Sequence, residues 1–172
     1  RLSMIAKVIH YCWFGHNPKP QLMQRCIESW KKYCPDYEII EWNESNFDIN
    51  LNAYTKMCYE QKKWAFVSDY VRLWALNQHG GVYLDTDVEV LKSFEDLLNN
   101  VAFIGLEESL AHFPGTCVMG CEAQCRWVKD MLALYDDICF VRKDGTFDMT
   151  TNVQRMGEKL VEQGFTPCRE EQ

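Results

Sequence analysis

The sequence predicts an α/β protein with a mostly parallel central sheet flanked by helices. Short apolar runs rich in β-formers alternate along the chain with longer stretches whose apolar residues recur at helical spacing. Such alternation is typical of helices packed on the faces of a parallel sheet. No repeat and no linker composition divides the 172 residues, so we expect one domain over residues 1–172.

The first third of the chain predicts a strand, a helix and a second strand. Residues 7–12 and 37–42 are β-rich runs, and the second is closed by a polar stretch. Residues 21–33 predict an amphipathic helix between them. The apolar positions of this helix are Leu22, Cys26, Ile27 and Trp30.

The rest of the chain continues the alternation. Residues 52–61 and 64–78 predict helices, and Gly80 and Gly81 end the second one because glycine readily adopts the left-handed conformation of a helix end. Further strands are expected at residues 82–84, 88–91, 102–106 and 116–119, and further helices at residues 122–135 and 151–162.

Charge, hydropathy and cysteine content exclude several classes of protein. The chain has 25 acidic and 18 basic residues, a net charge of −7, and an acidic surface repels the phosphates of nucleic acids. No stretch approaches the ~18 apolar residues of a membrane span, and no signal peptide is visible. With nine cysteines and no secretory signal, free thiols in a reducing compartment, the cytoplasm, are expected.

Three cysteines recur every four residues, Cys117, Cys121 and Cys125, and would share one face if the segment were helical. Gly115 and Gly120 interrupt this stretch, and no CxxC pair occurs. Buried small hydrophobic side chains are therefore favoured over a thiolate metal site.

The strongest chemical signal comes from two carboxylates, Asp85 and Asp87, placed one residue apart after a short apolar strand. In extended backbone their side chains share a face, and open α/β sheets bind ligands at the carboxyl ends of their strands. Two acidic oxygen donors with open coordination suit Mg²⁺ or Mn²⁺ that also holds a diphosphate. A solvated acidic turn is the alternative interpretation.

The helix before this pair adds a second polar pair. Residues 64–78 are apolar on two opposite faces, which indicates a helix buried on both sides. Asp69 and Arg72, three residues apart, would be neighbours where unpaired charges are costly. We interpret them as a carboxylate and a guanidinium aimed at the same polar ligand as the aspartate pair; the alternative is a solvated surface ion pair of little energetic value.

Residues 9–15 (IHYCWFG), 68–72 (SDYVR) and 80–87 (GGVYLDTD) form three blocks. Together they resemble the DXD-motif glycosyltransferases of the Och1-like family, glycosyltransferase family 32. This family includes bacterial capsular-polysaccharide transferases, fungal mannosyltransferases and α-1,4-galactosyltransferases. The large clostridial glucosylating toxins share the three blocks in the same order. The resemblance covers residues 5–107.

The resemblance implies a GT-A fold, a nucleotide-sugar donor, a divalent metal, usually Mn²⁺, and retention of the anomeric configuration. A UDP-sugar is favoured over GDP-mannose as donor, and the acceptor would be a polysaccharide such as capsule, a glycolipid or a protein. A cytoplasmic enzyme able to associate with the inner face of the membrane is expected. Because family members usually continue further, we expect the chain to be truncated at its C-terminus, and residues 1–3, before Met4, to be left over from cloning.

By position, the resemblance assigns donor contacts to the first two blocks. Trp13 would stack on the nucleotide base, although a core tryptophan is an equally good interpretation of this residue alone. Ser68, Asp69 and Arg72 would hold the donor sugar and its phosphate end. Asp69 and Arg72 are the expected catalytic pair, since one would orient the sugar and the other would oppose negative charge on the departing diphosphate.

The third block would bind the metal. Asp85 would face the ribose and the metal, and Asp87 would be the direct metal ligand. Tyr83 would lie beside the nucleotide-sugar, and Asn46, in an earlier turn, is a further candidate for a donor contact. No catalytic nucleophile is apparent, in keeping with the retaining mechanism of the family.

Two other functions compete with this one. A haloacid-dehalogenase-type phosphotransferase also has Asp-x-Asp after an apolar strand, but it expects Thr or Val where this chain has Glu89, and it expects the motif after the first strand. A non-catalytic module that binds nucleotide or sugar is the second alternative. Donor turnover, phosphoester hydrolysis that depends on Asp85, and binding without turnover distinguish the three.

Overall fold

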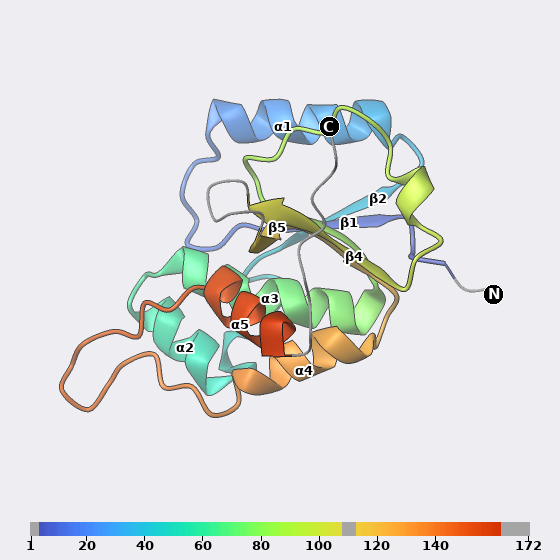
Figure 1. Cartoon of the computed structure of the whole chain (residues 1–172). Helices are drawn as coiled ribbons and strands as arrows, with labels where there is room; N and C mark the ends of the chain where they lie inside the picture. Colours follow the sequence, from blue (N-terminus) through green and yellow to red (C-terminus); the bar gives the residue numbers. More distant parts are fainter. Residues whose placement is uncertain (1–3, 108–112, 163–172) are drawn as a thin grey trace.

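The computed structural model describes residues 4–107 and 113–162, and in this part of the chain five strands form one sheet between two layers of helices. The strands are β1 (Val8–Cys12), β2 (Glu38–Trp42), β3 (Gly81–Leu84), β4 (Ala102–Glu107) and β5 (Phe113–Cys121). The helices are α1 (Gln21–Tyr33), α2 (Ala53–Glu60), α3 (Trp64–His79), α4 (Arg126–Leu134) and α5 (Asn152–Glu162), with short 3₁₀ turns at Ile49–Leu51 and Glu95–Leu97. Helix α1 covers one face of the sheet, and α2 to α5 lie on the other (Figure 1). The predicted α/β fold is confirmed.

The sheet is mixed, with strand order β2-β1-β3-β5-β4. Strand β1 pairs in parallel with β2 and β3, whereas β5 runs antiparallel to β3 and β4. Four strands therefore point the same way and β5 is reversed. Because Cys12 pairs with Trp42, and His10 with Tyr83, the carboxyl ends of β1, β2 and β3 lie at one edge of the sheet.

Two apolar clusters fill the space between the sheet and its helices. Strand β3 contributes Val82 and Leu84 to the cluster under α1, and Tyr83 to the cluster on the side of α3. Successive side chains of a strand point to opposite faces, so a strand covered on both sides is apolar throughout. This explains why the four residues of β3 are all buried.

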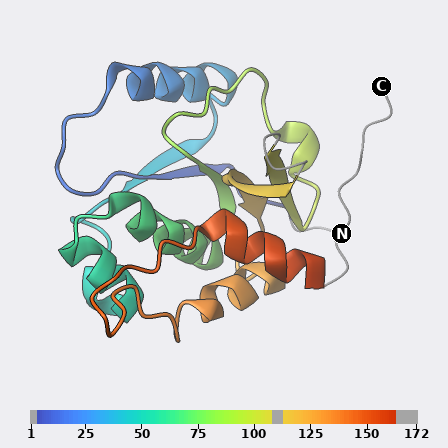
Figure 2. The ribbon, with the colours of Figure 1, turned by 60° about the vertical axis from the view of Figure 1, so that its left-hand side comes forward.

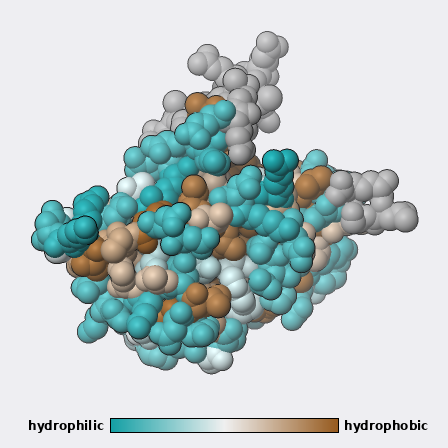
Figure 3. Space-filling view, turned by 90° about the horizontal axis from the view of Figure 1, so that it is seen from below, coloured by the Kyte–Doolittle hydropathy of each residue, from teal (hydrophilic) through white to brown (hydrophobic). Residues whose placement is uncertain are grey.

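The outer surface of the helical layer is polar. Seen from below, it is mostly hydrophilic, with small separate apolar patches (Figure 3). This is the surface expected of amphipathic helices that bury their apolar sides on a sheet. In the described part of the chain, no helix is long and apolar enough to cross a membrane.

One predicted element is wrong, and another begins later than predicted. Residues 88–91 form no strand, because their backbone groups bond to helix α1: Trp30 Nε1 donates to the Val88 carbonyl (2.8 Å), and the Val90 N–H donates to Ser29 Oγ (2.9 Å). The helix predicted at 122–135 begins only at Arg126, because the chain turns at Gln124, whose φ is 59°.

Seven of the described cysteines are free thiols, as predicted: Cys12, Cys26, Cys34, Cys58, Cys121, Cys125 and Cys139. Cys117 and Cys121 lie in β5, and Cys125 precedes α4, so the three do not share a helix face. Among residues 4–107 and 113–162, no group of three His, Cys, Asp or Glu side chains could hold a metal by itself.

Candidate functional site

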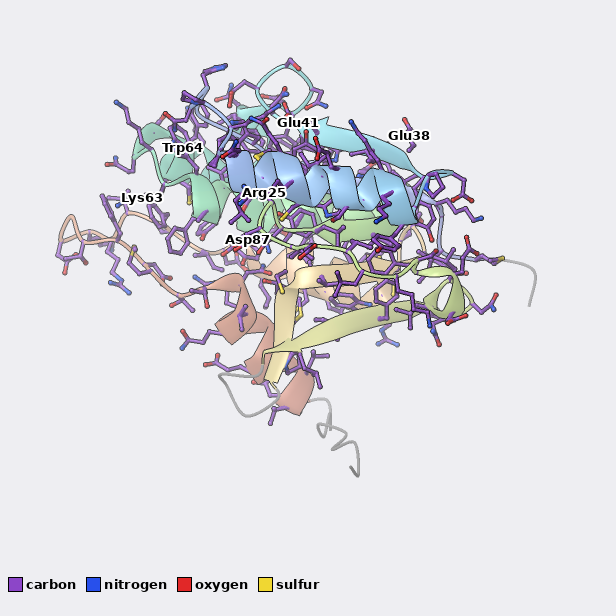
Figure 4. The ribbon with its side chains drawn as sticks, turned by 90° about the horizontal axis from the view of Figure 1, so that it is seen from above. Arg25, Glu38, Glu41, Lys63, Trp64 and Asp87 are labelled. Carbon is purple, nitrogen blue, oxygen red and sulfur yellow. The ribbon has the colours of Figure 1, made fainter. Side chains whose placement is uncertain are left out.

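A cavity of about 350 Å³ opens where β1 and β3 end. Its wall comes from the loop after β1, one face of α3 and the turn after β3, and it includes Trp13, Phe14, Trp64, Ser68, Arg72, Tyr83, Asp85 and Asp87. Figure 4 shows Trp64, Asp87 and Glu41 at this end of the sheet, and Glu38 at the opposite end. Six of the eight predicted site residues line the cavity; Asn46 and Asp69 do not.

The spacing on α3 places its polar residues in the cavity wall. Trp64, Ser68 and Arg72 are four residues apart and therefore share one face of the helix. Val67 and Val71, on another face, are fully buried in the core. The predicted burial of this helix on both sides is confirmed.

Arg72 is a buried cation whose guanidinium is bonded on several sides. Nε donates to the Ser68 carbonyl (3.1 Å), Nη2 to Ser68 Oγ (2.9 Å) and Nη1 to the Thr116 carbonyl (2.8 Å). Nη2 also lies 3.1 Å from Asp85 Oδ1 and 3.6 Å from Asp69 Oδ1. Two carboxylates thus compensate one buried charge, which excludes the alternative of a solvated surface pair.

The two aspartates after β3 differ in environment. Asp85 Oδ1 accepts a hydrogen bond from the Tyr83 hydroxyl (3.0 Å) as well as facing Arg72. Burial raises the pKa of Tyr83 well above its usual value, which keeps this hydroxyl protonated as a donor. Asp87 is exposed and makes no hydrogen bond or ion pair with any described residue. One carboxylate is therefore anchored, and the other is free.

These two residues fit a divalent cation that is shared with a ligand. Mg²⁺ commonly binds one or two carboxylates and completes its coordination with substrate phosphates and water. Asp87 and the second oxygen of Asp85 would supply those carboxylates. Because the described residues offer no third acidic, histidine or cysteine ligand here, a diphosphate would have to complete the site.

Asp69 lies behind Arg72, outside the cavity wall. Its Oδ2 accepts a hydrogen bond from the backbone N–H of Asn152 (3.0 Å), and its Oδ1 faces Arg72. Burial raises the pKa of Asp69 to about 6, although Arg72 and the Asn152 N–H oppose that rise. The closest charged partner of this carboxylate is Arg72.

Trp13 and Asn46 occupy different positions relative to the cavity. Trp13 is half-buried against the core, its Nε1 donates to the Asn17 carbonyl (2.9 Å), and it also lines a second cavity of about 470 Å³ between the loops after β1 and β2. Asn46 lines neither cavity. Its amide holds a turn by accepting from the Asn43 N–H (2.9 Å) and donating to the Glu41 carbonyl (2.8 Å).

Sequence reasoning missed several residues that build the site. Thr116 on β5 and Asn152 on α5 bond the charged side chains of α3 across 44 and 83 residues of sequence, and no local pattern marks them. Gly15 has a φ of +93°, and a Cβ there would lie 2.4 Å from the Trp64 ring. Gly15, the last residue of the block at residues 9–15, was the sequence signal for this close approach to Trp64.

Comparisons with known proteins agree with this geometry. Residues 20–104 match the family model described as "Glycosyltransferase sugar-binding region containing DXD motif". Residues 20–104 are therefore similar to the sugar-binding region of DXD-motif glycosyltransferases. The fold matches the solved structure "PaToxG Glycosyltransferase" with a TM-score of 0.73 and 18% identity, over 94% of this chain and 70% of that chain.

Two curated proteins are similar in sequence. The chain is 27% identical to "Subversion of eukaryotic traffic protein A" of Legionella pneumophila over 55% of its own length and 19% of that protein. It is 27% identical to "Inositol phosphoceramide mannosyltransferase 3" of Schizosaccharomyces pombe over 59% of its own length and 30% of that protein. The chain thus spans less than a third of these relatives. The match of residues 20–104 to the family model favours a glycosyltransferase over a phosphotransferase.

Proposed function

We propose that this chain is the donor-binding part of a metal-dependent, retaining glycosyltransferase. It would move a sugar from a nucleotide-sugar, a UDP-sugar in preference to GDP-mannose, to a polysaccharide, a glycolipid or a protein. One observation carries this proposal: Asp85, anchored by the buried Arg72, and the free Asp87 line one cavity at the carboxyl edge of the sheet. That arrangement suits a ligand with a diphosphate and a sugar.

Each side chain has a defined part in this proposal. Trp13 would offer an aromatic face to the nucleotide base, and Asp87 would bind Mn²⁺ or Mg²⁺ together with the diphosphate. When bound, the metal would neutralise negative charge on the leaving diphosphate. Arg72 adds positive charge at the cavity wall, and it acts mainly through its field and by holding Asp85, because its N–H groups are already engaged.

We also propose that the protein works in the cytoplasm, where it can associate with the inner face of the membrane. The free thiols of buried cysteines such as Cys12, Cys58 and Cys121 support a reducing compartment. Capsular polysaccharide is one candidate product, and the family resemblance supports it.

A thermal-shift panel tests the proposal, using UDP- and GDP-sugars, each with and without Mn²⁺. At 100 times its dissociation constant, a ligand adds about 2.7 kcal/mol of apparent stability. We expect a shift that requires both one nucleotide-sugar and the metal, followed by release of nucleoside diphosphate. A shift without turnover would instead indicate a binding module, and no shift with any donor would contradict the proposal.

A further inference from the structure

The buried residue Asn152 joins helix α5 to Asp69. Asn152 is the first residue of α5 and is 1% exposed. Its backbone N–H donates to Asp69 Oδ2 (3.0 Å), and its Nδ2 donates to the Asp69 carbonyl (3.2 Å). Figures 1 and 2 both show the beginning of α5 beside α3. The two hydrogen bonds hold the side chain and the backbone of Asp69 at once.

A third hydrogen bond fixes the orientation of the Asn152 amide. Nδ2 also donates to the hydroxyl of Tyr135 (2.9 Å), itself 1% exposed. Both amide protons therefore have acceptors, and a reversed amide would lose these bonds. The remaining Oδ1 is buried without a hydrogen-bond donor among the described residues. Leaving a buried acceptor unpaired is unfavourable, so the contacts made by Nδ2 and the backbone must outweigh it.

The contacts continue from Asp69 to the cavity. Asp69 Oδ1 lies 3.6 Å from Arg72 Nη2, and the same nitrogen lies 3.1 Å from Asp85 Oδ1. The N-terminus of α5 also carries a partial positive charge that favours a carboxylate at this place. A shift of the Asp69 carboxylate would therefore change the position of Arg72, and with it the cavity wall at Asp85.

We infer that Asn152 is a positioning residue, which holds the Asp69 carboxylate against Arg72 and thereby sets the sugar-binding end of the cavity. The consequence for donor binding rests on the proposed function; the contact itself does not. Within the described part of the chain, Trp13 and Asp87, the proposed contacts for the base and the metal, make no hydrogen bond or ion pair with this network. Loss of Asn152 should therefore weaken sugar positioning and spare nucleotide binding.

The first test compares Asn152→Ala, and the milder Asn152→Ser, with a control in the same buried region. The control, Asn52→Ala, removes a buried asparagine that donates to the Tyr135 carbonyl and caps α2. With Mn²⁺ present, calorimetry measures affinity for UDP and for UDP-glucose, and an assay measures donor hydrolysis.

For the Asn152 variants, we expect affinity for UDP to stay within about threefold, while kcat for donor hydrolysis falls at least tenfold. The Asn52→Ala control should keep kcat within about threefold. In an Asp69→Asn background, Asn152→Ala should change kcat less than twofold, because residues that act through one another are not additive. An equal loss in both backgrounds, or in the control, overturns the inference.

An unfolding cycle tests the contact without any ligand. Asn152→Pro removes the backbone N–H that donates to Asp69 Oδ2, and proline is tolerated at the first position of a helix. Urea unfolding of Asn152→Pro, Asp69→Ala and the double variant should give a coupling of about tenfold in the unfolding constant, or about 1.4 kcal/mol. Additive values overturn the inference. If the chain binds no nucleotide at all, the proposed function fails, and this cycle still decides whether Asn152 holds Asp69.

Discussion

Nη2 of Arg72 lies 3.1 Å from Oδ1 of Asp85, joining helix α3 to the turn after β3. The arginine side chain is 6% exposed and the aspartate side chain 32% exposed, so a buried cation meets a carboxylate that opens into the cavity. A buried charge that loses its partner is strongly destabilising. The pair therefore links the stability of the fold to the chemistry of the site.

Replacing Arg72 by lysine should weaken both stability and donor turnover. Lysine keeps the charge but lacks the planar fork, so it cannot bond Ser68, Thr116 and Asp85 together. We expect the free energy of unfolding in urea to fall by about 2 kcal/mol, and donor turnover to fall at least 100-fold. Arg142→Lys is the matched control, because the Arg142 side chain is half-exposed and its ion pair with Asp148 is long, at 3.8 Å. Its free energy of unfolding should change by less than about 0.5 kcal/mol. An equal loss in both variants would contradict the role of Arg72.

Asp87→Asn should abolish metal-dependent nucleotide binding and leave the fold intact. The side chain is exposed and has no bonding partner among the described residues, so its charge is free for a cation. Calorimetry with UDP, with and without Mn²⁺, measures the effect, and urea unfolding should change by less than about 0.5 kcal/mol. The control is the nearby exposed Glu89, replaced by glutamine. Unchanged Mn²⁺ dependence in Asp87→Asn would refute the metal assignment.

Gly15→Ala should damage the cavity more than its backbone strain alone explains. At a φ of +93°, any side chain is strained, and a Cβ would also lie 2.4 Å from Cε2 of Trp64, which lines the cavity. We expect nucleotide affinity to fall about tenfold, or 1.4 kcal/mol. Gly145→Ala has a similar φ, +83°, with nothing within 4 Å of the added Cβ. This control should lose about 1 kcal/mol of stability and no affinity.

His10 should make the protein less stable in mild acid. Its Nε2 lies 2.8 Å from the Gly80 carbonyl, and its Nδ1 accepts from Trp42 Nε1 (3.0 Å). Burial lowers the pKa of His10 to about 4, with the Gly80 carbonyl opposing and His79 adding to the shift. Between pH 6.5 and 4 the unfolded chain binds this proton and the folded chain does not. Stability should therefore fall by about 3 kcal/mol as pH drops through this range.

Urea unfolding across that pH range, compared with His10→Gln, isolates the effect. The comparison is needed because Asp69, with its pKa raised to about 6, has the opposite sign: its folded form binds a proton first, which adds stability as pH falls below 6. The difference between wild type and variant should shrink toward pH 4. A constant difference would show that His10 does not titrate in this way.

Local patterns predicted most of the fold. The apolar spacing of residues 21–33 and 64–78 corresponds to α1 and α3 within one residue, and the glycines after α3 end it at Gly80, whose φ is 63°. Such signals lie within a few residues of the element that they describe. The strand predicted at residues 88–91 is wrong because the backbone groups of Val88 and Val90 bond to α1, and a short apolar run occurs in buried loops as well as in strands.

For the candidate site too, the sequence predicted some features and the tertiary structure decided others. Spacing and residue type predicted Asp85 and Asp87 as a pair, but burial and bonding decide that Asp85 is anchored while Asp87 is free. Asn46 was predicted to contact the donor because of its place in a turn, but in the structure its amide hydrogen bonds stabilise that turn. A side chain's local sequence does not say which partners the rest of the chain will bring to it.

By itself, the sequence determined the α/β class, the helix that carries Asp69 and Arg72, and the carboxylates that suit a metal, since periodicity and motif spacing act over short distances. Only the tertiary structure decided that β5 is reversed, that Thr116 bonds Arg72, and that Asn152 reaches Asp69 across 83 residues. Those contacts arise when strands and helices distant in sequence pack around one core. Their energy depends on burial and geometry, which no short stretch of residues encodes.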